Sequence, residues 1–171
     1  MGKKSTKENK NIYQVCREKL DLTREQAAEL LEVISADRIE KIENERSYPH
    51  PDEVVIMAEK YKAPELCNKF CALECPIGKE YVPEVAMKEL SQITLEMLAS
   101  LNSVEKKKDR LIEIVADGEI EEAEYEDFVR IQDELEKISL AVEGLQLWVQ
   151  KMIAEGRIDE EKLEEYRKGT D

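Results

Sequence analysis

Apolar residues recur every three or four positions over most of the chain, which is the spacing of amphipathic α-helices. Short segments of this kind fill the first half, and capping or turn-forming residues separate them. Two much longer segments fill the second half and end at Gly118 and Gly156. Glycine closes helices because it adopts the left-handed conformation at little cost. The pattern therefore predicts an all-α protein.

Five short helices are predicted between residues 11 and 78. Thr23 begins the second with a T-x-x-Q capping box, in which the glutamine reaches back to the cap. Ser35 is the expected N-cap of the third helix. Pro51 suits the first position of the fourth helix, because proline lacks the N–H that would be unpaired there. Pro64 starts the fifth.

Each long segment of the second half carries a continuous apolar stripe with alternating steps of three and four residues, as in a coiled coil. The stripes comprise Met87, Leu90, Thr94, Met97, Leu101, Val104, Lys108, Leu111 and Val115 in the first segment and Phe128, Ile131, Leu135, Ile138, Val142, Leu145, Val149 and Met152 in the second. We expect a long antiparallel helical hairpin followed by a short terminal helix. Apolar residues off the stripes, such as Leu98 and Trp148, favour a homodimer, with a monomeric three-helix bundle as the alternative.

Charge divides the chain unequally. The 171 residues carry a net charge of −14, of which residues 1–83 contribute −2 and residues 84–171 contribute −12. The first part could approach a polyanion, whereas the second part would be repelled by one. No apolar run approaches the roughly 20 residues of a membrane span, so we expect no membrane partner. The N-terminus lacks an apolar signal core, and we expect a cytoplasmic protein with reduced cysteines.

These patterns suggest four segments. Residues 1–10 form a basic flexible arm, either simply solvated or a weak phosphate-binding element, and residues 11–78 form the domain of short helices. Residues 79–84 are expected to be a linker. Residues 85–171 are expected to form the acidic helical hairpin, a dimerisation or partner domain.

The order of motifs in the first domain carries a family resemblance. The pattern consists of Arg17-Glu18, then Leu22-Thr23-Arg24-Glu25-Gln26-Ala27-Ala28-Glu29-Leu30-Leu31, then Ile39-x-x-Ile42-Glu43-Asn44 and Pro49. Over about residues 11–62 it resembles the lambda-repressor/Cro-like helix-turn-helix family, also called the xenobiotic-response-element family. The resemblance implies a five-helix repressor-like domain whose third helix enters the DNA major groove. It also implies a buried ion pair between Arg17 and Glu43.

The same resemblance gives candidate DNA contacts. The positions expected at base edges or phosphates are Arg24, Ser35, Ala36, Arg38, Lys41 and Arg46. Arginine makes strong bidentate contacts with guanine, and lysine suits phosphates. Asp37 and Glu40 lie on the same expected face, where phosphates would repel them. The chain also has Glu45 where the family commonly has glycine, and the turn over residues 32–35 lacks its usual glycine.

Two functions remain open at this point. One is a sequence-specific DNA-binding transcriptional regulator that acts as a dimer, with the helix at about Ser35–Asn44 in the major groove of double-stranded DNA. The other is an interaction or adaptor protein that keeps the helix-turn-helix fold without binding DNA. Its acidic hairpin, over residues 85–155, would then bind a protein partner.

Other chemistry finds less support. Cys67, Cys71 and Cys75 recur every four residues and, with Cys16 or His50, could hold a metal ion. Their CxxxCxxxC spacing matches no common zinc motif, and helical cysteines often serve as small buried hydrophobic residues. The chain carries no Gly-rich phosphate loop or nucleophile motif. We therefore expect no enzyme activity and no cofactor.

Overall fold

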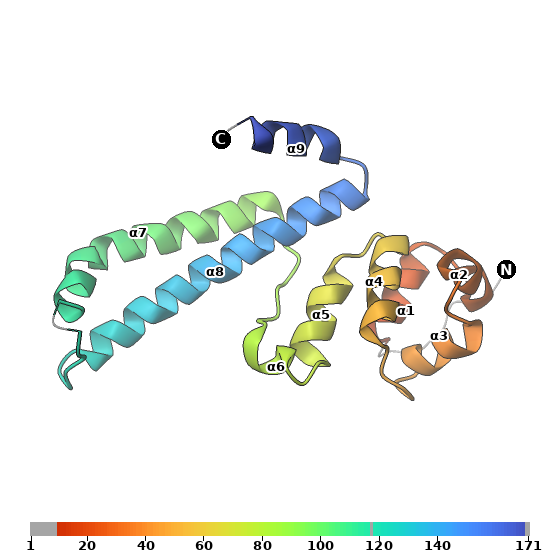
Figure 1. Ribbon diagram of the computed structural model, residues 1–171, viewed down its shortest axis with the longest axis horizontal. Helices are drawn as coiled ribbons and strands as arrows, with labels where there is room; N and C mark the ends of the chain where they lie inside the picture. The colour runs from red at the N-terminus through yellow and green to blue at the C-terminus, as the bar shows by residue number, and fades with distance from the viewer. Residues whose placement is uncertain (1–9, 117, 170–171) are drawn as a thin grey trace. The chain divides into compact units, whose positions relative to one another are not determined.

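A computed structural model describes residues 10–116 and 118–169. Within these ranges the protein has nine helices and no strand, so the all-α prediction is confirmed (Figure 1). The helices are α1 (Ile12–Lys19), α2 (Arg24–Leu31), α3 (Ala36–Glu43), α4 (Pro51–Lys60), α5 (Glu65–Leu73), α6 (Gly78–Tyr81), α7 (Leu90–Ile114), α8 (Tyr125–Ala154) and α9 (Glu160–Lys168).

The chain divides into two compact units. One comprises the described parts of Met1–Glu84 and Val149–Asp171, and the other comprises the described part of Val85–Trp148. The sequence had instead assigned everything after residue 84 to the hairpin. Lys151 explains the difference, because its Nζ donates to the carbonyl oxygen of Lys62 at 2.7 Å and lies 3.8 Å from Glu65 Oε1. These contacts join the end of α8 to the domain of short helices.

The expected linker also differs, because residues 78–81 form the short helix α6. Gly78 permits this arrangement. A Cβ atom added there would lie 2.0 Å from the carbonyl oxygen of Cys71, so any side chain would force the backbone of α5 away. The two helices approach closely only because residue 78 is glycine.

The predicted helix starts are confirmed in detail. The Thr23 side chain accepts from the backbone N–H of Gln26 at 3.2 Å, and the Gln26 side chain accepts from the N–H of Thr23 at 2.9 Å. Ser35 caps α3 by accepting from the N–H of Arg38 at 3.2 Å. Pro51 is the first residue of α4. These local signals are reliable because each needs only neighbours in sequence.

Each of the helices α1–α4 is followed, within two residues, by a residue other than glycine that has a positive φ angle. These φ angles are 55° at Asp21, 63° at Glu32, 57° at Glu45 and 53° at Lys62. Left-handed backbone costs about 1 kcal/mol for a residue with a Cβ atom. Both positions where the sequence lacked an expected glycine, in the turn after α2 and at Glu45, therefore keep the conformation that glycine would favour.

The first unit is built around a single hydrophobic core. The buried residues of this core come from α1–α4, the start of α5 and the intervening turns: Tyr13, Cys16, Ala27, Leu31, Ile34, Ile39, Ile42, Val54, Met57, Ala58, Tyr61, Ala63 and Leu66. Ile39 and Ile42 anchor α3 by its inner side. The opposite side of α3 is consequently left to face solvent.

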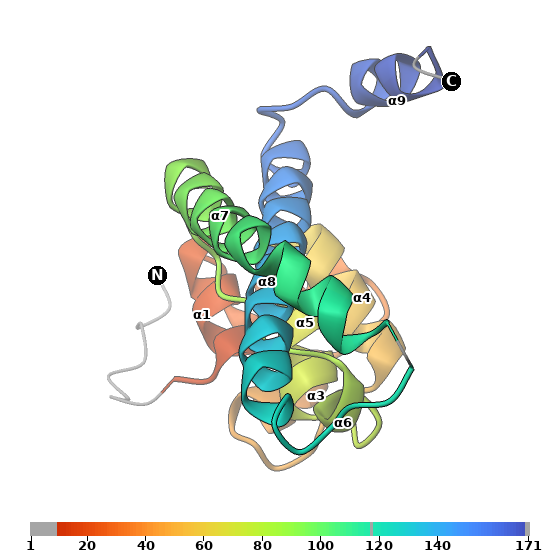
Figure 2. The same cartoon turned by 90° about the vertical axis from the view of Figure 1, so that its left-hand side faces the viewer.

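In the second unit, α7 and α8 run side by side and antiparallel (Figures 1 and 2). Arg110 Nε lies 2.8 Å from Asp127 Oδ2 near the turn, and Gly144 lies beside the side chain of Ile93 towards the other end. The predicted hairpin is therefore present. Its two helices have 25 and 30 residues.

The stripes that face each other across this hairpin are partly different from the predicted ones. The inner side chains, buried or half-buried, are Ile93, Met97, Ser100, Val104, Lys107, Leu111 and Ile114 on α7 and Ile131, Glu134, Ile138, Ala141 and Leu145 on α8. The prediction was wrong by one residue at Thr94, Leu101, Lys108 and Val115 in the first stripe and at Leu135 and Val142 in the second, and the predicted Met87 and Leu90 are exposed. Leu101, Val115, Leu135 and Val142 are consequently exposed.

Within the described residues, none of the helices combines the length and apolar character needed to cross a membrane.

Candidate nucleic-acid interface

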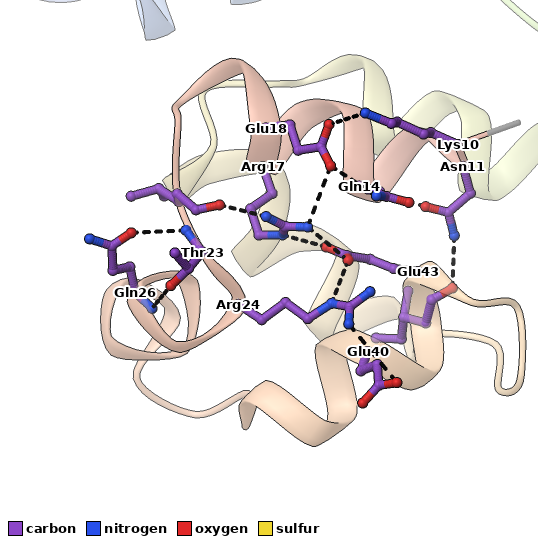
Figure 3. Close-up of polar contacts among 12 residues, drawn as sticks. Lys10, Asn11, Gln14, Arg17, Glu18, Thr23, Arg24, Gln26, Glu40 and Glu43 are labelled. Atoms are coloured by element: carbon purple, nitrogen blue, oxygen red, sulfur yellow. Dashed lines mark hydrogen bonds and ion pairs between the residues drawn. The ribbon is translucent and has the colours of Figure 1, made fainter. Parts of the chain in front are cut away.

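One buried carboxylate holds α1, α2 and α3 together. Glu43, with 1% of its side chain exposed, accepts from Arg17 Nε at 2.5 Å and from Arg17 Nη2 at 2.9 Å. Arg24 Nε donates to the same carboxylate at 2.8 Å (Figure 3). The structure thus contains the ion pair implied for Arg17 and Glu43, with Arg24 as a further member. Glu43 points inward and is not part of the outer face of α3.

The guanidinium of Arg17 is almost fully enclosed. Burial disfavours its charged form, but hydrogen bonding and attraction to Glu43 outweigh that effect and hold the pKa of Arg17 above its usual value. Burial of such a pair is tolerated because each charge is compensated by the opposite charge and hydrogen bonds of its partner. The orientation of α3 relative to α1 is therefore fixed by electrostatics as well as by the apolar core.

Arg24 lies at the border between this cluster and the solvent. Its side chain is 30% exposed, and its Nη1 lies 3.9 Å from Glu40 Oε1 on α3. Figure 3 shows the guanidinium between Glu43 and Glu40. Arg24 therefore connects the start of α2 to the outer face of α3 and is partly accessible to a ligand.

Arg38 has a different environment from Arg24. Its Nε and Nη2 each donate to a carboxylate oxygen of Glu53 at 2.7 Å, Nη1 donates to Ser47 Oγ at 2.6 Å, and Nη2 also donates to the carbonyl oxygen of Tyr48 at 2.9 Å. Hydrogen bonding from Arg38 lowers the pKa of Glu53 below its usual value, against the opposing effect of burial. In the free protein, Arg38 thus clamps the loop between α3 and α4.

The outer face of α3 carries its remaining charges in pairs. Lys41 Nζ lies 2.7 Å from Asp37 Oδ2, and Arg46 Nη1 lies 3.9 Å from Glu40 Oε1. The side chains of Lys41 and Arg46 are 50% and 69% exposed, so these pairs are in water and weak. Each cation expected to touch DNA therefore has a carboxylate within 4 Å.

The structure brings two of the expected contact residues together, because Arg24 and Arg46 both lie 3.9 Å from Glu40. Ser35 is exposed and Ala36 half-buried at the start of α3, next to the paired side chains of its first turns. Sequence reasoning did not anticipate the part played by Glu53 as the partner of Arg38. The only sequence feature that pointed to Glu53 was its position three residues after His50, the N-cap of α4. There the Glu53 carboxylate accepts from the backbone N–H of His50 at 2.7 Å. Residues 1–9 of the basic arm lie outside the described residues.

The cysteines do not form a site. Helix α5 ends at Leu73, and the N–H of Cys75 turns back to the carbonyl oxygen of Phe70 at 2.9 Å, so the spacing of four residues is broken. Burial raises the pKa of the Cys67 thiol. Across residues 10–116 and 118–169, no group of three or more His, Cys, Asp or Glu side chains is arranged to hold a metal ion.

Comparison with known proteins agrees with this geometry. A family model described as a helix-turn-helix matches residues 15–65, which include most of α1 and all of α2, α3 and α4. The match supports a DNA-binding fold for this part of the chain. Neither the comparison with curated proteins nor the comparison with solved structures gave a match.

Proposed function

We propose that this protein is a sequence-specific DNA-binding transcriptional regulator that acts as a dimer and places α3 in the major groove. The observation that carries the proposal is the arrangement of α2 and α3. The cluster of Arg17, Arg24 and Glu43 holds them together, and the outer face of α3 is left exposed. A helix presented in this way fits the width of the groove of B-form DNA.

Three cations are placed to meet phosphates. Arg24, Lys41 and Arg46 are exposed or partly exposed around α3. Ser35 and Ala36, at the start of the helix, are small enough to approach base edges. Arg38 is assigned to the loop between α3 and α4, because its donors already have partners there.

Binding DNA requires these cations to exchange partners. Asp37 and Glu40 attract Lys41, Arg24 and Arg46 in the free protein, and the same carboxylates would repel phosphates. Three contacts from each protomer correspond to a slope of about −5 in a plot of log affinity against log salt for a dimer. We expect each half-site to bind weakly, so that the dimer needs both half-sites for tight binding, and we expect the affinity to depend strongly on salt.

The pairing of every candidate cation favours one rival function. A face without unpaired positive charge is also the face of an adaptor, which would keep the fold and bind a protein through the acidic residues of 85–155. The two functions differ in what happens when the exposed cations are removed.

The test is fluorescence anisotropy of a labelled duplex from the region upstream of the protein's own coding sequence. Lys41→Ala with Arg46→Ala removes two proposed phosphate contacts without touching the buried cluster. We expect at least about 10-fold weaker binding and a shallower salt dependence. Lys162→Ala is the matched control, because Lys162 also forms an exposed pair with an aspartate, Asp159, at 3.5 Å. Equal affinity of all three proteins would contradict the proposal.

A further inference from the structure

Helix α7 carries a second apolar stripe that its partner α8 does not cover. Leu98, Leu101, Ile112 and Val115 are 51%, 45%, 58% and 54% exposed. They are large hydrophobic residues on one helix of an acidic unit that also exposes Leu95, Leu135 and Val142, and an exposed set of this kind commonly marks an interface. We propose that this stripe pairs with the same stripe of a second copy of the chain, with the two α7 helices antiparallel.

The stripe is separate from the seam of the hairpin. Its positions, in steps of three and four residues, are Leu98, Leu101, Glu105, Lys108, Ile112 and Val115. This is the spacing of a heptad repeat, with apolar residues at both ends and two charged residues, Glu105 and Lys108, at the centre. The side of α7 that faces α8 carries Ile93, Ser100, Lys107 and Ile114. These residues lie on a different side of the helix from the exposed stripe. Helix α7 therefore has two stripes. One packs against α8 within the chain, and the other is exposed.

Helix α8 extends the same surface. In α7 the exposed Leu101 follows the inner residue Ser100, and in α8 the exposed Leu135 and Val142 follow the inner residues Glu134 and Ala141. Antiparallel helices wind in opposite senses when viewed from one end, so these following positions lie on the same flank of the hairpin. The exposed side chains form one broad face, which suits the packing of two hairpins into a four-helix bundle.

The order of residues along the stripe identifies the occupant. Reading the stripe in reverse gives the same pattern about a point between residues 106 and 107. An antiparallel second copy would place Leu98 opposite Val115, and Leu101 opposite Ile112. At the centre it would place Glu105 opposite Lys108, twice by symmetry. A two-fold interface must be self-complementary in this way.

The central charges would also set the register. Within the chain, Lys108 Nζ lies 3.7 Å from Glu105 Oε1, and both side chains are more than half exposed. In the paired helices each would gain an opposite charge from the other copy, whereas a shift by one heptad would place both charges against leucine, isoleucine or valine. Polar residues in a stripe commonly fix register at some cost in affinity. This proposal rests on the dimer of the proposed function and supplies its interface.

The first experiment measures the mass of the full chain by sedimentation equilibrium. We expect twice the chain mass of 19.8 kDa for the wild type at micromolar concentration. Leu101→Glu places a charge in two symmetry-related apolar layers, and we expect dimerisation weaker by about 100-fold, or tenfold per layer. Ala99→Glu is the matched control, because Ala99 is exposed and lies off both stripes. The control should remain a dimer.

A charge exchange tests the antiparallel register. Glu105→Lys places lysine opposite lysine in both central layers and should weaken the dimer by about 10-fold or more. Adding Lys108→Glu restores opposite charges and should return the affinity to near that of the wild type. Circular dichroism at 222 nm confirms that each variant keeps its helices.

The outcomes separate this interface from DNA binding. A monomeric wild type would overturn the proposal, as would a Leu101→Glu protein that stays dimeric or a double charge variant that stays as weak as Glu105→Lys. A dimer held elsewhere would leave DNA affinity unchanged in Leu101→Glu, so the proposed function would survive. A dimer with the expected variants but no DNA affinity would confirm this interface and refute the proposed function.

Discussion

Replacing Glu43 with glutamine tests the buried cluster that positions α3. The carboxylate accepts three hydrogen bonds from Arg17 and Arg24, and its side chain is 1% exposed. Glutamine keeps the size but loses the charge and half of the acceptors. Arg17, with 8% of its side chain exposed, is then left as an uncompensated charge. Removing one partner of a buried ion pair costs about 3–5 kcal/mol.

That loss is a large part of the stability of a small domain, which is typically about 5–15 kcal/mol. Native-state hydrogen exchange of the amides in α1–α3 measures it without interference from the hairpin. Glu45→Gln is the control, because Glu45 is exposed two residues away and should change stability by less than about 0.5 kcal/mol.

A double substitution separates burial of charge from loss of packing. Arg17→Met with Glu43→Leu removes both charges and replaces them with apolar side chains of similar size. We expect this protein to recover most of the stability lost in Glu43→Gln, because no buried charge is left unpaired. Arg24 also loses Glu43, but its side chain is 30% exposed and still has Glu40 within 3.9 Å. The reasoning would be refuted if Glu43→Gln lost less than about 1 kcal/mol, or if the double variant were the least stable of the three.

Four further results are expected. Glu45→Gly should raise the free energy of unfolding by about 0.5–1 kcal/mol, because glycine relieves the left-handed backbone at φ 57°, and a urea titration measures this. Burial raises the pKa of Cys16 to about 11, so folding favours the neutral thiol, and its contribution to stability is retained below the ordinary pKa of 9.0 and lost as the pH rises through about 11. In urea titrations Cys16→Ala should reduce this alkaline loss, and the part that remains belongs to Tyr13 and Tyr61, whose pKa values burial also raises. The pKa of Glu53 is lowered chiefly by its hydrogen bond from Arg38, so this pair stabilises the fold above the ordinary carboxyl pKa of 4.5. The stabilisation is lost as the pH falls below that value. Arg38→Met should flatten this part of the plot of unfolding free energy against pH. Glu40→Gln releases two arginines and removes a charge from the outer face of α3, so it should tighten DNA binding by about 10-fold in an anisotropy titration, whereas an adaptor would show no DNA affinity with either residue.

The first domain was the more predictable part of the fold because its signals are local. Thr23, Ser35 and Pro51 each act on a helix that begins within a few residues. The packing of the hairpin was harder to predict, because α7 has two stripes of apolar residues that are partly offset from each other by one residue. Leu101 is more hydrophobic than its neighbour Ser100, yet the small serine is the buried residue of the two, at 6% exposed against 45%. At this position the choice of the more hydrophobic residue was therefore wrong.

The candidate site was only partly predictable for a related reason. The types and positions of its charges can be read from the sequence, but their pairing depends on how the helices pack. Arg24 and Arg38 were equivalent candidates for DNA, and the structure gives Arg24 a border position and Arg38 a closed set of partners in a loop. Nothing within a few residues of Arg38 signals the partner Glu53, which lies fifteen positions away in the chain.

The most direct test of the central claim compares two labelled duplexes in fluorescence anisotropy with the wild-type protein. One is the upstream region of its own coding sequence, and the other is the same sequence scrambled; both are titrated at low and near-physiological salt. The account predicts tight binding to the upstream duplex alone, weakening steeply as salt rises. Equally feeble binding to both duplexes at low salt would contradict it and would direct attention to a protein partner.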